Sequence, residues 1–319
     1  SLTSPIGAES WEVASHHNIT WTLRGSIPSA KLEYSIDGGA TYPSLITASV
    51  DASLGVYDWL IPDSLSTQLR VKITNTADST VYDASSANFT IKGALTITSP
   101  VGAETWVVGS AHNITWTRFG SIANVKLEYS TNGGTTYPNL IIAATDASTG
   151  SYAWNIPDAI GSNLKVKVTD VDNSLVFSTS TSVFSIRGSV TLTAPNGGEI
   201  WNVGASQNIT WTRTGSFANV KLEYSTNGFF DELQTTLIVA ATNAALGTYA
   251  WTVPDAIGNQ LKVRVSDASN SIVTDVSDAN FNIKGVLALL APNGAETWIV
   301  GASQNITWSR TGSIANVKL

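Results

Sequence analysis

Residues 113–129 read NITWTRFGSIANVKLEY and contain two runs in which apolar and polar side chains alternate. Ile114 and Trp116 stand between polar residues in the first run, and Val125 and Leu127 do so in the second. A period of two residues is typical of a β-strand that buries one face. The stretch therefore predicts two β-strands, each with one buried face.

Similar short alternating runs recur on both sides of this stretch. They include Leu95 with Ile97 before it and Leu164 with Val166 after it, and Gly, Pro, Asn or Asp stand between the runs. No window offers a sustained helical stripe. About seven such strands in roughly 100 residues are typical of an antiparallel sandwich. We therefore predict an all-β chain of tandem Ig-like or fibronectin-III-like antiparallel β-sandwiches.

The chain repeats itself along its whole length. Trp106 lies 95 residues after Trp11 and Trp201 lies 95 after Trp106, each within a near-copy of one motif string. Trp298 lies 97 residues after Trp201, because the third copy carries a two-residue insertion. A period near the size of one β-domain indicates a tandem array. The predicted Ig-like repeats are repeat 1 at 1–93, repeat 2 at 94–188, repeat 3 at 189–285 and a partial repeat 4 at 286–319.

Composition narrows the class of protein. The 319 residues carry a formal net charge of −7, and a mildly acidic chain without a basic repeat does not favour nucleic acid as a partner. Only 13% of the residues are charged while Ser, Thr, Asn and Gly abound, which favours an extracellular or cell-surface location. The chain has no cysteine, so neither disulfides nor thiolate metal sites hold it together. Its longest apolar stretch, 286–291, is far shorter than the roughly 20 residues of a membrane span.

Candidate catalytic and metal-binding groups have simpler interpretations. The turn at 35–42, SIDGGATY, resembles the Asp-box hairpin of sialidases and many unrelated β-proteins. In that motif the aspartate caps its own turn, and Asn132 and Asn227 stand in place of Asp37 in later repeats, as a turn cap permits. The position of His17 becomes glutamine in later repeats, and the linkers carry no carboxylate for calcium. We therefore predict no catalytic residue, no cofactor and no bound metal.

Each full repeat contains three tryptophans, which would stack on sugars if they were exposed. Trp116 and Trp154 each share a strand face with apolar side chains two residues away, which predicts burial in the core. Trp11 and its equivalents follow a glycine-containing turn instead. If any indole meets a ligand or a neighbouring domain, we expect it to belong to this last set.

Several residues are candidates for modification or for contact with a partner. Five N-x-[ST] triplets are candidate glycosylation sites, at Asn18, Asn88, Asn113, Asn208 and Asn305. Phe229 and Phe230 are adjacent in the turn of the third repeat, and neighbouring residues at a strand end point to opposite sides. At least one of them is therefore hard to bury, which indicates either self-association or docking, or a locally repacked loop.

The junctions between repeats have their own pattern. A basic residue stands just before each linker glycine, and a glutamate follows 12 positions later. We expect a polar contact near each junction, worth about 0–1 kcal/mol if exposed. The predicted pairs are Lys92 with Glu104, Arg187 with Glu199 and Lys284 with Glu296. A single linker glycine leaves little slack, which predicts a rather stiff rod that lengthens by roughly 30 Å with each module.

The motif string carries a family resemblance. The combination P-x-G-A-E-x-W … N-I-T-W, V-K-L-E-Y-S-x-x-G-G-x-T-Y and Y-x-W-x-I-P-D resembles the Ig-like domain of the Ser/Thr-rich GPI-anchored membrane family. That domain is also seen at the N-terminus of yeast cell-wall glucan-synthesis proteins, and similar modules occur in bacterial and archaeal surface proteins. The resemblance covers every repeat. It implies an extracellular, often repeated, binding or spacer domain and supplies no catalytic residue.

These observations favour a structural role outside the cell, as a stalk, fibre or filament built from rigidly linked Ig-like modules. The alternatives are a cell-surface adhesin or glycan-binding array, and a noncatalytic spacer of a larger secreted enzyme. Residues 286–319 hold about three strands, whose Trp298 and Trp308 would face a second sheet that this segment lacks. We therefore expect the partners to be further repeats of the same chain or other copies of it, with surface glycans or proteins as the alternative.

Overall fold

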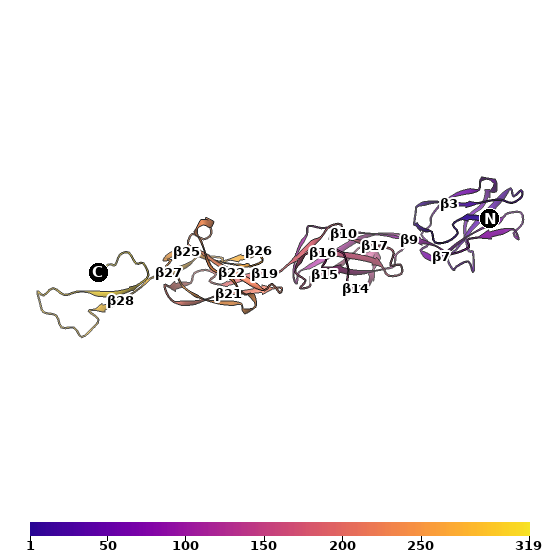
Figure 1. The fold of residues 1–319 in the computed structure, drawn as a ribbon. Coiled ribbons are helices and arrows are strands. Elements are labelled where there is room, and N and C mark those ends of the chain that lie inside the picture. The colour runs from indigo at the N-terminus through magenta and orange to yellow at the C-terminus, as the bar shows by residue number, and fades with distance from the viewer. The chain divides into compact units, whose positions relative to one another are not determined.

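The computed structural model describes residues 1–319, and contacts divide them into two units. The first unit comprises Ser1–Thr105, Ala111–Asn155 and Gly161–Ser185, and the second comprises Trp106–Ser110, Ile156–Ile160 and Ile186–Leu319. Strands, turns and short 3₁₀ helices make up each of the three full repeats, and strands recur along the whole chain (Figure 1). No helix has the length and the apolar character needed to cross a membrane.

The first repeat is a sandwich of a three-stranded and a six-stranded sheet. Its elements are β1 (Leu2–Ser4), β2 (Ser10–Glu12), β3 (His16–Trp21), β4 (Ser29–Ser35), β5 (Ser44–Asp51), η1 (Ala52–Leu54), β6 (Val56–Leu60), β7 (Ser66–Asn75), β8 (Tyr82–Ala84) and β9 (Phe89–Lys92). The strand order is β1-β3-β6 in the smaller sheet and β2-β9-β7-β4-β5 in the larger, with β8 paired to β7.

The second repeat has the same two sheets. Its elements are β10 (Ala94–Ser99), β11 (Thr105–Val107), β12 (Ala111–Phe119), β13 (Asn124–Ser130), β14 (Asn139–Asp146), η2 (Ala147–Thr149), β15 (Ser151–Asn155), β16 (Gly161–Asp170), β17 (Phe177–Thr179) and β18 (Phe184–Arg187). The strand orders are β10-β12-β15 and β11-β18-β16-β13-β14, with β17 paired to β16.

The third repeat follows this plan and adds one short helix. Its elements are β19 (Ser189–Ala194), β20 (Ile200–Asn202), β21 (Ser206–Thr214), β22 (Asn219–Ser225), η3 (Glu232–Gln234), β23 (Thr235–Asn243), η4 (Ala244–Leu246), β24 (Thr248–Thr252), β25 (Gly258–Asp267), β26 (Asn270–Val276) and β27 (Phe281–Lys284). The strand orders are β19-β21-β24 and β20-β27-β25-β22-β23, with β26 paired to β25. After it, β28 (Val286–Ala291) and β29 (Thr307–Thr311) form a two-stranded sheet.

The buried faces follow the alternation predicted from the sequence. Ile114, Val125 and Leu127 are fully buried, and Trp116 is 3% exposed. The indole N–H of Trp116 donates to the carbonyl oxygen of Ala147 in η2 at 3.0 Å, and the first and third repeats have the equivalent bond. The bond satisfies a donor that would otherwise be buried without a partner. The all-β sandwich prediction is confirmed.

Trp11 and its equivalents in the second and third repeats are buried, although the sequence favoured this set for contact with a ligand or a neighbouring domain. Trp11 and Trp201 are each 7% exposed, and Trp106 is 6% exposed. The Trp11 ring stacks on His17 at a centroid distance of 4.6 Å and meets Trp59 edge-on at 6.1 Å. The strand that carries Trp11 has only three residues, so it is too short for alternation to predict its buried side.

One pairing departs from the predicted antiparallel arrangement. β2 runs parallel to β9, with Trp11 opposite Ile91, and β20 runs parallel to β27. Parallel neighbours need a long connection, and here most of a repeat connects them. The central pairings of β4 with β5 and with β7 are antiparallel, as predicted.

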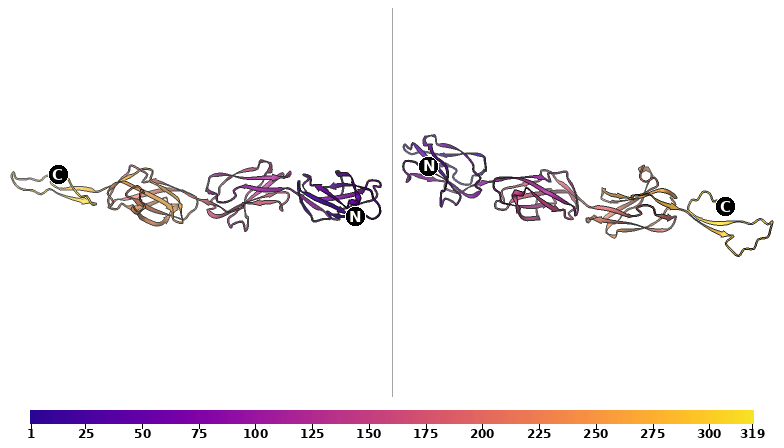
Figure 2. Two further views of the ribbon diagram at one scale, coloured as in Figure 1. Left: turned by 90° about the horizontal axis from the view of Figure 1, so that it is seen from above. Right: turned by 180° about the vertical axis from the view of Figure 1, so that it is seen from behind.

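The sheet of β28 and β29 leaves its apolar side chains exposed. Trp308 is 39% and Leu289 48% exposed, whereas their equivalents in the third repeat, Trp211 and Leu192, are 3% and 1% exposed. Trp298 is 45% exposed. Both views in Figure 2 show this hairpin without a second layer of strands. The side chains that pack against the larger sheet in a full repeat therefore lie uncovered here.

Candidate functional site

The turn after β4 is held by side chains that cap it. Asp37 Oδ1 accepts hydrogen bonds from the Ser35 hydroxyl at 2.6 Å and from the Thr41 N–H at 3.0 Å. The Ser35 hydroxyl first, and then Thr41, hold the pKa of Asp37 well below its ordinary value of 3.8. In the second repeat Asn132 Oδ1 accepts from the Thr136 N–H at 3.0 Å. The carbonyl oxygen of an amide thus performs the same capping, which is a structural role.

The chain after this turn places an aromatic ring over the outer face of the larger sheet. In the second repeat the ring centroid of Tyr137 lies 5.8 Å from Lys167 Nζ, on β16. The ring centroid of Phe177, on β17, lies 4.5 Å from the same nitrogen. The pairing of β17 with β16 fixes this arrangement, since it sets Phe177 opposite Thr169. We call Tyr137, Lys167 and Phe177 the cation-ring site of the second repeat.

The cation-ring site of the second repeat borders a shallow, open depression, which Thr135, Lys165 and Thr179 also line. Phe177 is 51% exposed. Tyr137 is half-buried, and burial raises the pKa of its hydroxyl against the opposing effect of a hydrogen bond with Thr179. The depression therefore combines aromatic surface, hydroxyl groups and two ammonium groups.

The two lysines of this depression have no carboxylate partner. Glu128 stands opposite Lys167 in the sheet, but its carboxylate pairs with Lys126 at 2.9 Å. Lys165 Nζ donates to the carbonyl oxygen of Thr181 at 3.2 Å, and neither Lys165 nor Lys167 forms an ion pair. On a chain of net charge −7, this is a local concentration of positive charge.

The first repeat has a second version of the cation-ring site, formed by Tyr42, Lys72 and Tyr82. Lys72 Nζ lies 4.8 Å from the centroid of the Tyr42 ring and 5.8 Å from that of Tyr82, which is 64% exposed. Burial raises the pKa of the Tyr42 hydroxyl. Glu33 lies 3.8 Å from Lys72 Nζ and 2.8 Å from Lys31 Nζ, so the positive charge of this version is partly neutralised.

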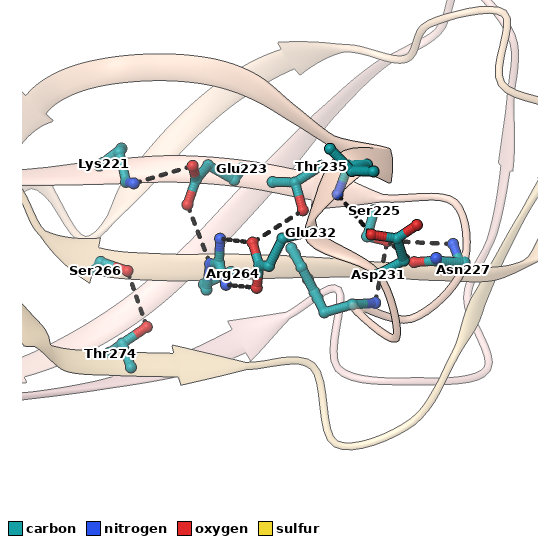
Figure 3. Close-up of polar contacts among 12 residues, drawn as sticks. Lys221, Glu223, Ser225, Asn227, Asp231, Glu232, Thr235, Arg264, Ser266 and Thr274 are labelled. Atoms are coloured by element: carbon teal, nitrogen blue, oxygen red, sulfur yellow. Dashed lines mark hydrogen bonds and ion pairs between the residues drawn. The ribbon is translucent and has the colours of Figure 1, made fainter.

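In the third repeat, carboxylates of that repeat pair with the cation at the equivalent position (Figure 3). Arg264 stands where the other repeats have Lys72 and Lys167. Its NH1 and NH2 groups donate to the two oxygens of Glu232 at 2.8 and 2.9 Å, and its Nε donates to Glu223 at 3.0 Å. The bond with Glu232 is the largest cause that raises the pKa of Arg264, and the same bond lowers the pKa of Glu232.

The aromatic rings at this position also differ in the third repeat. The Phe229 ring lies 4.6 Å from the Arg264 guanidinium, where the other repeats have the ring of the tyrosine that follows the turn. Thr274 stands in place of the aromatic residue of β17 and donates or accepts a hydrogen bond with Ser266 at 2.8 Å. Phe230 is 94% exposed, so of the two adjacent phenylalanines only Phe229 finds an intramolecular ring contact.

The predicted junction ion pairs do not form. Glu104 instead accepts from the N–H groups of Val101 and Gly102 at 2.8 and 2.7 Å, and Lys92 lies 3.5 Å from Glu12. The equivalent glutamates accept the equivalent backbone bonds. The three pairs that this arrangement excludes are Lys92 with Glu104, Arg187 with Glu199 and Lys284 with Glu296. Each glutamate is held by the backbone donors of its own turn, which lie closer than the cation.

Each junction has the same polar contact, and it is not the predicted ion pair. Within the first unit, Asp63 Oδ1 accepts from the Ser121 N–H at 2.9 Å, and Asp63 Oδ2 accepts from the Ser121 hydroxyl. Within the second unit the contact recurs, with the same separation of 58 residues, as Asp158 with Ser216 and Asp255 with Ser313. The Ser313 hydroxyl is the largest cause that lowers the pKa of Asp255. The recurring I/V-P-D and G-S sequences were available as a signal, but sequence alone does not pair them.

The candidate glycosylation sites fall into two groups. Four of them are exposed and lie on or before the outward face of β3 or its equivalents: Asn18, Asn113, Asn208 and Asn305. Asn88 differs, because it is half-buried and its carboxamide oxygen accepts from Arg70 Nε at 2.8 Å. A glycan on Asn88 would have to displace that contact.

Comparisons with known proteins gave matches among solved structures alone. No protein-family model and no curated protein matches the chain, so the resemblance to the Ser/Thr-rich GPI-anchored membrane family rests on the motifs alone. Among solved structures, the fibronectin(III)-like modules of Clostridium thermocellum CbhA are 21% identical over 60% of this chain and 94% of theirs, with a TM-score of 0.22. The N-terminal four Ig domains of Dscam1 isoform 6.9 are 10% identical over 89% of this chain and 73% of theirs, with a TM-score of 0.33.

The sheets and cores described above define the class of protein. The chain is a tandem array of β-sandwich modules of the Ig-like and fibronectin-III-like kind. Modules of this kind are typical of extracellular structural or adhesive proteins.

Proposed function

We propose that the chain is a structural extracellular repeat protein, in which stiffly linked Ig-like modules form a stalk, fibre or filament. The observation that carries this proposal is the recurring aspartate–serine contact at the junctions. A contact used only to stabilise one module would not need to join the I/V-P-D turn of one repeat to the G-S turn of the next. Its repetition at one separation supports a junction of defined geometry.

The linker glycines support the same proposal. Gly93 is buried between β9 and β10, and a Cβ built on it would lie 2.6 Å from the carbonyl oxygen of Phe119 and 2.8 Å from Ile122. Gly188 has an equally close neighbour, the carbonyl oxygen of Thr214 at 2.6 Å. Glycine at these positions lets the backbone pack against the following module, which restricts rotation about the linker.

Removing the junction contact tests the proposal. We expect Asp63→Ala to broaden the distribution of distances between spin labels placed in the first and second repeats. The matched control is Asp78→Ala, because Asp78 also caps a turn, through the Thr80 N–H at 3.0 Å, but contacts no other repeat. An unchanged distribution in the Asp63 variant would refute a stiffening role for this contact.

We also propose that β28 and β29 are completed by strands equivalent to those of a full repeat. The exposed Trp308, Leu289 and Trp298 support this, because their equivalents are buried by a second sheet. The strands would come from a further repeat of the same chain or from another copy of it. If another copy supplies them, hydrogen exchange of residues 286–311 slows as protein concentration rises. If exchange of these residues stays fast at every concentration, another copy does not supply the strands, and only a further repeat of the same chain could do so. If exchange is also fast in the native filament, neither source completes the sheet.

Glycosylation of the exposed sequons fits an extracellular location but depends on a host with the machinery. We propose Asn18, Asn113, Asn208 and Asn305 as sites, and not Asn88, because of its bond with Arg70. Peptide mass spectrometry of the native secreted protein tests this. Bare asparagine at all of these sites would reject the proposal.

The second candidate function is a noncatalytic cell-surface adhesin or glycan-binding array. The cation-ring sites of the first and second repeats favour it, because they expose aromatic rings beside positive charge. A spacer of a larger secreted enzyme remains the third candidate. Binding of two-repeat fragments on a glycan array would favour the adhesin, and its absence would favour the structural role.

A further inference from the structure

We propose that the cation-ring sites of the second and first repeats bind the uronic-acid residues of an acidic polysaccharide, and that the third repeat does not. This inference goes beyond the structural role and does not depend on it. It starts from the third repeat, where a carboxylate already occupies the position. Glu232 places both oxygens against Arg264 while the Phe229 ring lies on the same guanidinium. The chain itself thus shows which ligand chemistry this position accepts.

The second repeat has the cation and the rings but lacks that carboxylate. The insertion that brings Glu232 to Arg264 is absent there, and Glu128 is engaged by Lys126. The Lys167 ammonium group lies over two aromatic rings and forms no ion pair, and Lys165 donates to a backbone carbonyl. A carboxylate from outside can therefore take the place that Glu232 takes in the third repeat.

The rings on both sides of Lys167 indicate that this carboxylate belongs to a sugar. A pyranose ring presents a flat face of C–H groups, which packs against exposed aromatic rings such as Phe177. The hydroxyls of Thr135 and Thr179 line the same depression and can donate to or accept from sugar hydroxyls. A uronic acid combines the apolar face, the hydroxyls and the carboxylate in one residue, whereas a neutral sugar leaves both lysines unpaired.

The first repeat has the same elements at lower net charge. Tyr42 and Tyr82 supply the rings, and Lys72 the cation, but Glu33 lies 3.8 Å from that cation. We therefore expect the order of affinity to be second repeat, then first, with no binding at the third. Sites on two modules of one chain would engage a polymer together, which raises the overall affinity above that of either site.

The test titrates the full chain with hexagalacturonate and with a neutral glucose hexasaccharide, and follows amide NMR shifts. Hexagalacturonate should shift amides around Gly134 and Thr179, with smaller shifts around Tyr42 and none around Thr235. The neutral hexasaccharide should bind at least about tenfold more weakly, as expected for a lost charged hydrogen bond. Added salt should weaken the binding of hexagalacturonate.

Four variants assign the site. Lys167→Gln should weaken binding at the second repeat by about tenfold or more, and Lys167→Arg should retain it, which separates charge from folding. Phe177→Thr copies the third repeat and should also lose binding. Lys284→Gln removes one exposed positive charge from β27, outside the depression, and is the matched control that should bind as the parent does.

The third repeat provides the reverse experiment. Glu232→Gln combined with Thr274→Phe removes the internal carboxylate from Arg264 and supplies the ring that the third repeat lacks, and it should produce hexagalacturonate-dependent shifts around Thr235 that the parent lacks. Three results would overturn the proposal: equal binding of the neutral hexasaccharide, unchanged binding by Lys167→Gln, or shifts at the third repeat of the parent protein. Competition by inorganic phosphate as strong as that by hexagalacturonate would also overturn it, because the site would then bind any anion.

Discussion

Phe229 offers a test in which two opposing contributions can be separated. Its φ angle is +64°, in the left-handed region, where the first and second repeats have Gly39 and Gly134. Its N–H still donates to the Ser225 hydroxyl at 3.0 Å, as the glycines do to their serines. The third repeat therefore keeps the shape of the turn with a residue that is strained in it, and it gains a ring contact with Arg264 in return.

The magnitudes follow from these contacts. Phe229→Ala keeps the left-handed backbone with a Cβ and loses the ring over Arg264, worth about 0.5–1 kcal/mol at an exposed site. Phe229→Gly loses the same ring but relieves a strain of about 1–2 kcal/mol. Glycine also has greater conformational freedom in the unfolded chain, which lowers the free energy of unfolding by about 0.4–1 kcal/mol. We therefore expect the glycine variant to be more stable than the alanine variant by about 1 kcal/mol.

Calorimetry of the full chain, with hydrogen exchange of peptides from the third repeat, measures this difference. One kcal/mol corresponds to a shift in Tm of about 4–8 °C for a module of this size. The control is Gly134→Ala, where the new Cβ would lie 2.8 Å from the Tyr137 hydroxyl at a φ of +91°, and it should destabilise the second repeat. Equal stability of Phe229→Ala and Phe229→Gly would refute the idea that the turn strains this residue.

Two further predictions concern the turn cap and the core. The stabilisation by Asp37 should be present above its ordinary pKa of 3.8 and should be lost as the pH falls towards its lower pKa in the folded state. Protection of the Thr41 amide from hydrogen exchange should therefore fall in acid. Asp37→Asn should remove this acid dependence, and the equivalent amide of Thr136, which Asn132 caps, should not show it. Trp116→Phe should cost about 1–3 kcal/mol, because the buried carbonyl of Ala147 loses its indole donor, and an unchanged Tm would contradict this.

The sequence predicts what depends on neighbours along the chain. The alternation of Ile114 and Trp116 with polar residues determines which side chains are buried, because a strand exposes alternate residues to one face. The capping role of Asp37 was predictable for the same reason, since Ser35 and Thr41 lie within four residues of it. Local geometry leaves few alternatives at such positions.

Contacts between distant segments were less predictable. Lys92 and Glu104 have a suggestive spacing, but the backbone donors of Val101 and Gly102 are closer to the carboxylate and hold it. The contact of Asp63 with Ser121 joins two turns that are 58 residues apart, so its existence depends on how one module meets the next. A charge pattern in the sequence shows that an ion pair is chemically possible. Which donors lie within hydrogen-bonding distance of the carboxylate depends on the fold.

Tandem repeats allow a comparison that a single domain does not offer, because equivalent positions face almost the same local fold. The junction aspartate and serine are present at all three junctions, from Asp63 with Ser121 to Asp255 with Ser313. The outer face of the larger sheet instead carries Lys72, Lys167 or Arg264, each with different rings and carboxylates. Since the sandwich tolerates each version, this face is not what determines the fold. The aspartate–serine contact at the module ends therefore recurs in the same form, whereas the charged and aromatic groups on the sheet face differ from one repeat to the next.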